Sequence, residues 1–299
     1  MPQHTEFRGV FAAIATPFRP DGEVDQHRLR RLVDDVIIDG VHGLVPVGST
    51  GEFASLTGDE RRRILEVVIE QAAGRVPVVA HTGAMTSKEA IDLSRHAEQT
   101  GAAGLLLLPP YKDRLSIEET TAYFCSVADA TSLPVVVYNL PLATGVNLTP
   151  EDIVGMVKGS PNIAYVKDTC GDWHQLTRSI HDYSDVYSTL IGWDTMFLGA
   201  LVEGAAGCIL GVTNLTAKPF VSIYDAVRSG DLGAARAEWD RVYPVVRFLL
   251  SGGYVGGLKG AMDAFGKSIG DPRSPLAAID AKRHSEISEI LKEFAASAS

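Results

Sequence analysis

The sequence has few cysteines and no long run of basic residues. Its 299 residues include three cysteines, Cys125, Cys170 and Cys208, and no Cys-x-x-Cys pair. An odd number of scattered cysteines argues against a disulfide framework and predicts reduced thiols in a cytoplasmic protein. Lysine and arginine total 27 against 37 aspartate and glutamate residues, which gives a formal charge of −10. Because nucleic acids are bound by basic surfaces, we expect no nucleic acid partner.

The chain also lacks the usual signals of targeting and membrane segments. Residues 1–6 contain no basic start followed by an apolar run, so no signal peptide is expected. One stretch of 21 residues, 130–150, carries no charge, but it contains three prolines. A buried strand followed by a loop explains this stretch better than a membrane helix does, so no membrane association is expected.

Short apolar runs alternate with amphipathic segments along most of the chain. Hydrophobic residues make up 45% of the sequence, which is enough for a large core without a disulfide or metal. Apolar runs that are not interrupted by polar residues indicate strands of a parallel sheet covered on both faces. Eight such strands are expected, at residues 10–16, 43–47, 76–81, 104–108, 133–138, 163–167, 186–192 and 207–211.

Helix signals lie between these runs. A Ser/Thr-x-x-Glu capping box precedes three expected helices, at residues 57–60, 86–89 and 116–119. A Gly-x-x-Gly segment leads from a helix into a strand three times, at residues 40–43, 101–104 and 204–207. This echo is typical of a repeated structural unit.

Eight strand–helix units in about 220 residues predict a (β/α)8 TIM barrel. The alternative is a doubly wound open sheet, which normally carries a glycine-rich phosphate turn after its first strand. This chain has Thr16-Pro17-Phe18 at that place. Beyond about residue 229 the pattern is helical. We therefore expect residues 1–228 to form the barrel that carries the active site and residues 229–299 to form a C-terminal helical extension packed on it.

Candidate catalytic residues follow the strands, because the site of such a barrel lies at the C-terminal ends of its strands. Lys167 ends the sixth apolar run. Desolvation among apolar walls favours its neutral amine, which can attack a ketone and form a Schiff base. The alternative is a lysine that extends to solvent. Tyr138 ends the fifth run, so it should neighbour Lys167. Its phenol could transfer a proton near the amine. The alternative is a tyrosine that only covers the core.

A glycine-rich turn follows the second expected strand. Residues 48–52 read Gly-Ser-Thr-Gly-Glu, and two glycines allow successive N–H groups to converge on an anion such as a carboxylate. A purely structural turn is the alternative. Tyr111, Thr169 and Asp194 are weaker candidates near the ends of other strands. His81 has no second ligand at metal-binding spacing, so no metal is expected.

Together, these segments resemble the dihydrodipicolinate synthase and N-acetylneuraminate lyase family. The turn at residues 48–52, Tyr-Asn-Leu-Pro at 138–141 and Val-Lys-Asp-Thr at 166–169 occur in the family's order, and the similarity covers nearly the whole chain. The resemblance implies a (β/α)8 barrel and a Schiff base between lysine and pyruvate or another 2-oxo acid. It also implies no metal or diffusible cofactor, and a homotetramer built from dimers.

The resemblance also implies roles for individual residues. Lys167 would be the imine-forming nucleophile and Tyr138 the acid/base residue. Ser49 and Tyr111 would belong to a hydroxyl relay, in which Tyr111 reaches the neighbouring subunit's site. The implied substrate-binding residues are Thr50, Gly51, Thr169, Gly192, Asp194 and Ile209.

Two departures from the synthase branch bear on the substrate. That branch has an arginine shortly after its Tyr-Asn motif, where this chain has Ala143, and it usually has a tyrosine pair, where this chain has Pro110-Tyr111. The residues at 48–52 and 167–172 are more similar to aldolases of sialic acid and 2-keto-3-deoxy sugar acids, in which a carboxylate such as Asp194 binds a hydroxyl.

We therefore expect a class I aldolase or lyase that joins or separates pyruvate and an aldehyde, acting on a 2-keto-3-deoxy sugar acid or a related 2-oxo acid. The alternatives are 4-hydroxy-tetrahydrodipicolinate synthase, a keto-deoxy sugar acid dehydratase and a non-catalytic protein that binds a 2-oxo acid.

Overall fold

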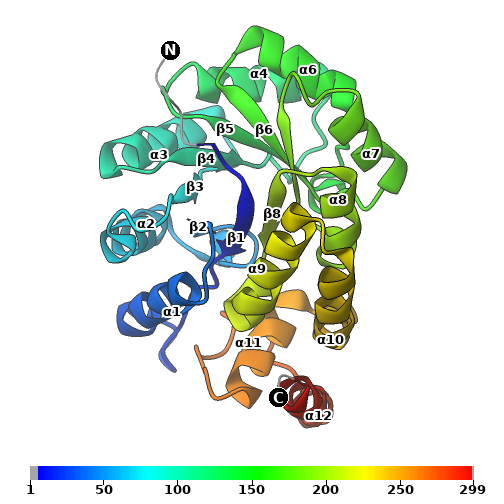
Figure 1. Cartoon of the computed structure of the whole chain (residues 1–299). Helices are drawn as coiled ribbons and strands as arrows, with labels where there is room; N and C mark the ends of the chain where they lie inside the picture. The colour runs from blue at the N-terminus through cyan, green and yellow to red at the C-terminus, as the bar shows by residue number, and fades with distance from the viewer. Residues whose placement is uncertain (1–5, 298–299) are drawn as a thin grey trace.

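Eight short parallel strands lie at the centre of the computed structural model, which describes residues 6–297 (Figure 1). They pair in the order β2-β1-β8-β7-β6-β5-β4-β3, and a parallel bridge between Leu44 and Val78 connects the two ends of this sheet. The predicted TIM barrel is confirmed, and the doubly wound alternative is wrong. The strands are β1 (Gly9–Ala13), β2 (Gly43–Val45), β3 (Val79–His81), β4 (Gly104–Leu107), β5 (Val135–Asn139), β6 (Ile163–Asp168), β7 (Ser188–Ile191) and β8 (Gly207–Leu210).

Helices form a ring outside the strands (Figure 1). Thr57 and Ser116 form the expected capping boxes with the glutamates three residues later, whereas Thr86 only accepts from the Glu89 N–H. A short helix, α5, was not expected from the sequence. The ring comprises α1 (Gln26–Ile38), α2 (Gly58–Ala72), α3 (Ser87–Thr100), α4 (Ile117–Ala128), α5 (Pro141–Thr144), α6 (Pro150–Gly159), α7 (Trp173–His181), α8 (Phe197–Glu203) and α9 (Thr213–Ser229).

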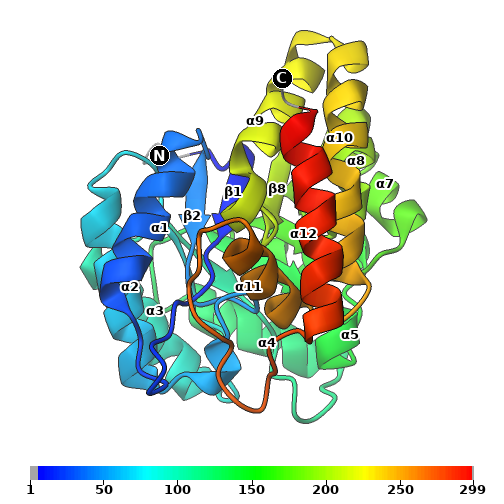
Figure 2. The ribbon, with the colours of Figure 1, turned by 90° about the horizontal axis from the view of Figure 1, so that it is seen from below.

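Three further helices follow the barrel: α10 (Leu232–Leu250), α11 (Tyr254–Ala264) and α12 (Ala281–Ala296). The last helix lies alongside α10 and also contacts α11 (Figure 2). The middle helix, α11, ends at Ala264, and the chain turns at Gly266, where φ is +78°.

No helix within residues 6–297 is both long and apolar enough to cross a membrane. The expectation of no signal peptide concerns residues 1–6, of which only Glu6 lies in the described range. The outer ends of the two predicted parts, residues 1–5 and 298–299, also lie outside that range.

Glycines allow the strands to close around bulky residues in the barrel interior. The rings of Phe7 and Phe11 are buried there, 5.8 Å apart and edge to face. The second glycine of each Gly-x-x-Gly segment begins a strand. A Cβ on Gly43 would overlap the Phe11 ring, one on Gly104 would meet the Phe7 ring at 2.6 Å, and one on Gly207 would overlap the backbone of β1. The repeated glycine is therefore a condition for closing the barrel.

Replacing Gly207 with alanine should destabilise the protein, because the new methyl group would push β8 away from β1. Overpacking of this kind typically costs about 1–3 kcal/mol. Urea denaturation measures the free energy of unfolding. The matched control is Gly155→Ala on α6, where a Cβ meets no atom within 4 Å and should stabilise the helix by about 0.5–1 kcal/mol. Equal effects of the two substitutions would contradict this account of barrel closure.

Candidate active site

A cavity of about 200 Å³ opens where the strands end. Eight of the ten predicted site residues line it, although they come from widely separated parts of the sequence. Gly51 and Tyr111 are the two that do not. The eight are Ser49, Thr50, Tyr138, Lys167, Thr169, Gly192, Asp194 and Ile209.

Lys167 and Tyr138 are direct neighbours in this pocket. They are register partners on β6 and β5, as the sequence predicted, and Lys167 Nζ lies 3.9 Å from the centroid of the Tyr138 ring. The two residues are 6% and 4% exposed. No carboxylate of residues 6–297 lies within ion-pairing distance of this Nζ. The arrangement places an amine beside a phenol in an enclosed site.

The space around Lys167 depends on Gly192. A Cβ at Gly192 would meet Lys167 Cε at 2.7 Å and would overlap the Thr169 hydroxyl. The missing side chain therefore leaves room for the lysine to reach the pocket. Thr169 Oγ1 is buried and makes no hydrogen bond to any described residue, so its hydroxyl is free to contact a ligand.

The turn at residues 48–52 presents Ser49 and Thr50 to the pocket, whereas Gly51 supports the turn from behind. A Cβ on Gly51 would meet the Ile14 carbonyl oxygen at 2.9 Å. The Gly51 carbonyl accepts a 2.7 Å hydrogen bond from Thr16 Oγ1. The contacts of Gly51 are thus with the protein rather than with the cavity.

Tyr111 lies apart from the pocket of its own chain. Its side chain is 37% exposed, and its ring packs edge to face on Phe53 with the centroids 5.7 Å apart. The hydroxyls of Tyr111, Ser49 and Tyr138 form no hydrogen bond with one another in the described chain. The hydroxyl relay implied by the resemblance is therefore not assembled within one subunit.

Asp194 has a partner that the sequence analysis missed. It begins the short 3-10 helix after β7, and its Oδ1 accepts a 2.8 Å hydrogen bond from the Tyr254 hydroxyl on α11. Burial raises the pKa of Asp194 to about 6, even though this hydrogen bond acts in the opposite direction. A Cβ on Gly211 would meet Tyr254 Oη at 2.8 Å and Thr50 Oγ1 at 2.7 Å, so this glycine lets the two hydroxyls approach.

The other lining residues that were missed are mainly apolar. Lys167 is the single cationic side chain and Asp194 the single carboxylate among the residues that line the pocket. Residues from α10 and α11 have no local sequence signal, since only the packing of the C-terminal region brings them to the barrel. The missed residues are Leu140, Trp193, Gly211, Leu250, Tyr254 and Val255.

Comparisons with known proteins cover nearly the whole chain. A model of the Dihydrodipicolinate synthetase family matches residues 6–294. The 4-hydroxy-tetrahydrodipicolinate synthase of Syntrophus aciditrophicus is 33% identical over 288 residues, covering 96% of this chain and 98% of that protein. The 4-hydroxy-tetrahydrodipicolinate synthase of Nitrobacter hamburgensis is 36% identical over 276 residues, covering 92% of this chain and 93% of that protein.

A solved structure has the same arrangement. YagE, a prophage protein of E. coli K12 that belongs to the dihydrodipicolinic acid synthase family, was crystallised in complex with pyruvate. It is similar to this chain with a TM-score of 0.93 and 31% sequence identity, over 97% of this chain and 99% of its own.

Replacing Asp194 with asparagine should reduce the pH dependence of stability between pH 5 and pH 7. The pKa of Asp194 is about 6 in the folded protein, whereas its ordinary value is 3.8. The carboxyl therefore binds its proton more tightly in the folded protein than in the unfolded chain. Stability of the wild type therefore falls as the pH rises through this window. Between the two pH values the wild type should lose about 1 kcal/mol more than the variant, as measured by urea denaturation.

The matched control is Asp185→Asn, which removes an aspartate from the exposed surface. This variant measures how the loss of one surface charge changes the pH dependence of the free energy of unfolding. If Asp194→Asn and Asp185→Asn changed the pH dependence equally, burial of Asp194 would not be the cause.

Proposed function

The chain belongs to the dihydrodipicolinate synthetase family, a family of class I pyruvate-dependent aldolases and lyases, and we propose that it joins or separates pyruvate and an aldehyde through an imine on Lys167. The observation that carries this proposal is the placement of the Lys167 amine against the Tyr138 ring inside the pocket. A buried amine without a carboxylate partner is suited to attack on a ketone.

The pocket offers groups for each part of pyruvate. The ketone carbon meets Lys167, while the hydroxyl of Thr50 and the backbone N–H groups of Ser49 and Thr50 hold the carboxylate. Ile209 lines the pocket from β8 and contacts the bound acid there. Ser49 stands beside Thr50 on the same turn and extends the set of hydroxyl groups.

The reaction follows from the imine. In the cleavage direction, the Lys167 nitrogen bonds to C2 of the 2-oxo acid substrate, and the ketone oxygen leaves as water. The C4 hydroxyl then loses its proton, the C3–C4 bond breaks, and the protonated imine accepts the released electron pair, which gives an aldehyde and the enamine of pyruvate. Protonation at C3 and hydrolysis release pyruvate and the free amine. Tyr138 delivers or removes the protons, since its phenol neighbours the reacting nitrogen. Synthesis runs through the same steps in reverse.

The rest of the pocket favours a neutral aldehyde that carries a hydroxyl group. Asp194 accepts hydrogen bonds, and Tyr254 fixes its orientation from α11. Leu140 and Trp193 add apolar surface. A carboxylate that accepts from a hydroxyl, surrounded by apolar walls, suits a 2-keto-3-deoxy sugar acid or a related 2-oxo acid as the substrate that is cleaved.

4-Hydroxy-tetrahydrodipicolinate synthase is the second candidate, because similar proteins carry that name. Its aldehyde, aspartate semialdehyde, has a carboxylate of its own. Lys167 is the only cationic side chain among the residues that line the pocket, and in the proposed reaction its nitrogen is bonded to the substrate as the imine. The position of the synthase arginine is occupied by Ala143, an exposed residue on α5. These features favour the sugar acid.

The assembly we propose is a homotetramer built from dimers. Tyr111 is exposed in the loop between β4 and α4, and its own chain does not direct it into the pocket. A partner subunit could receive this hydroxyl and so complete a proton relay with Ser49 and Tyr138.

Borohydride should trap pyruvate on Lys167. Reduction of the imine leaves a stable secondary amine, which intact-mass and peptide mass spectrometry locate. Lys167→Arg should give no adduct, because a guanidinium remains protonated and cannot attack a ketone. Lys218, on the helix that follows β8, provides the control, since Lys218→Arg should trap as the wild type does. An adduct on another lysine, or none in the wild type, would overturn the mechanism.

Introducing the missing cation should raise activity toward aspartate semialdehyde. Ala143→Arg is expected to increase kcat/KM for this aldehyde by about fivefold, since the position is exposed and an exposed ion pair is typically worth up to about 1 kcal/mol. Leu142→Arg is the matched control, because it adds the same charge to the adjacent, 78% exposed position. A wild-type kcat/KM of about 10⁴ M⁻¹s⁻¹ or above for aspartate semialdehyde would instead favour the synthase.

A further inference from the structure

Strained backbone bounds the turn that presents Ser49 and Thr50. Val47 has φ +59° and Glu52 has φ +60°, although neither is glycine. A β-branched residue rarely adopts this left-handed conformation, and such positions persist only where surrounding contacts hold them. The conformation of the turn is therefore imposed by its surroundings rather than by its own preferences.

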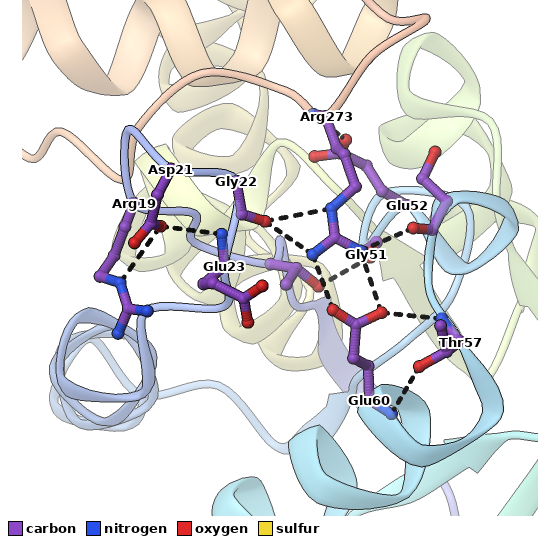
Figure 3. Close-up of polar contacts among 11 residues, drawn as sticks. Arg19, Asp21, Gly22, Glu23, Gly51, Glu52, Thr57, Glu60 and Arg273 are labelled. Carbon is purple, nitrogen blue, oxygen red and sulfur yellow. Dashed lines mark hydrogen bonds and ion pairs between the residues drawn. The ribbon is translucent and has the colours of Figure 1, made fainter.

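The contacts that hold Glu52 come from the C-terminal region. Its side chain is fully buried, and its Oε1 lies 2.6 Å from Lys259 Nζ on α11, where the lysine is 2% exposed. Its Oε2 accepts a 2.8 Å hydrogen bond from the Arg273 backbone N–H (Figure 3). Lys259 also donates to the Asp271 carbonyl at 3.2 Å. One carboxylate thus connects the turn to both α11 and the loop that follows it.

The Arg273 side chain secures that loop against the barrel (Figure 3). Its guanidinium forms a 2.7 Å ion pair with Glu60 and donates to the Gly22 carbonyl at 2.7 Å. The same guanidinium lowers the pKa of Glu60 to about 2. Lys259 Nζ and Arg273 Cζ lie 4.3 and 4.5 Å from the centroid of the Phe18 ring, so both cations contact the same aromatic side chain.

We infer that Glu52 and Lys259 are positioning residues that hold the turn in its ligand-binding conformation. Neither residue lines the pocket, so neither touches the substrate. A buried ion pair is often no more stabilising than neutral side chains of the same volume, so stability alone is a poor reason for it. The pair instead fixes Glu52 and, through the intervening residues, directs Thr50 and the turn's N–H groups at the pyruvate carboxylate. This inference rests on the proposed function.

The test is a double variant, Glu52→Gln with Lys259→Met, which removes both charges without leaving either one unpaired. Glutamine retains an acceptor for the Arg273 N–H, so the chain should fold. Pyruvate is titrated in the presence of borohydride, and the adduct on Lys167 is quantified by mass spectrometry. The half-saturating pyruvate concentration should rise about tenfold or more, the scale of one lost charge-assisted contact. The amount trapped at saturation should stay unchanged, because Lys167 itself is intact.

The matched control is Glu238→Gln with Arg241→Met. This pair lies on α10, where Arg241 stacks on Phe294 and donates to its carbonyl, so it secures α12 without touching the turn. The control should lower the unfolding temperature and leave half-saturation unchanged. If it shifted half-saturation as much as the double variant does, general loss of stability would explain the result and the inference would fail.

The remaining outcomes are equally decisive. A folded double variant with wild-type half-saturation overturns the inference while the imine mechanism stands. Absence of any Lys167 adduct in the wild type overturns both.

Should the double variant not fold, Glu52→Asp keeps the charge but shortens the reach to Lys259. It should raise half-saturation with no change at saturation, and an unchanged half-saturation would count against the inference.

Discussion

Parallel pairing of β5 with β6 sets Tyr138 opposite Lys167, and the proposed chemistry of the pocket depends on this register. In a closed barrel, alternate residues of each strand point inward. A slip of one residue would turn the amine or the phenol outward among the helices. Val136 and Tyr165 fill the interior along the same two strands, so the register is supported by packing as well as by hydrogen bonds. The pocket is therefore the last layer of the barrel interior, and its reactive groups take the place of core side chains.

Glycine residues permit close approach of other atoms at both ends of the barrel interior. At the start of β8, Gly207 lets the strand approach β1, and near the pocket Gly192 leaves the space that Lys167 occupies. Gly211 allows the hydroxyls of Thr50 and Tyr254 to come together. In each case a methyl group would meet atoms that the barrel or the reaction needs. These glycines are required for close approach and not for loop flexibility.

The C-terminal region reaches the site in two ways. Tyr254 donates to Asp194 inside the pocket, while Lys259, one turn further along α11, binds Glu52 behind it. The first contact shapes the part of the cavity that would receive the aldehyde, and the second supports the part that would receive the carboxylate. One helix, α11, thus contacts residues at both parts of the proposed substrate site. The remaining walls supply little charge, which supports the proposal of a neutral aldehyde.

Local patterns in the sequence determined the strand count, most helix starts, the barrel and the residues that end its strands. Lys167, Tyr138 and the turn at residues 48–52 could be found because the C-terminal ends of barrel strands necessarily meet at one face. Tertiary structure alone decided that Tyr254 would donate to Asp194, that Lys259 would pair with Glu52, and that Tyr111 would lie apart from its own pocket. Such contacts join segments far apart in the chain, and their geometry depends on how whole helices pack. Periodicity and capping report only the conformation of a few neighbouring residues, so they carry no information about those distances.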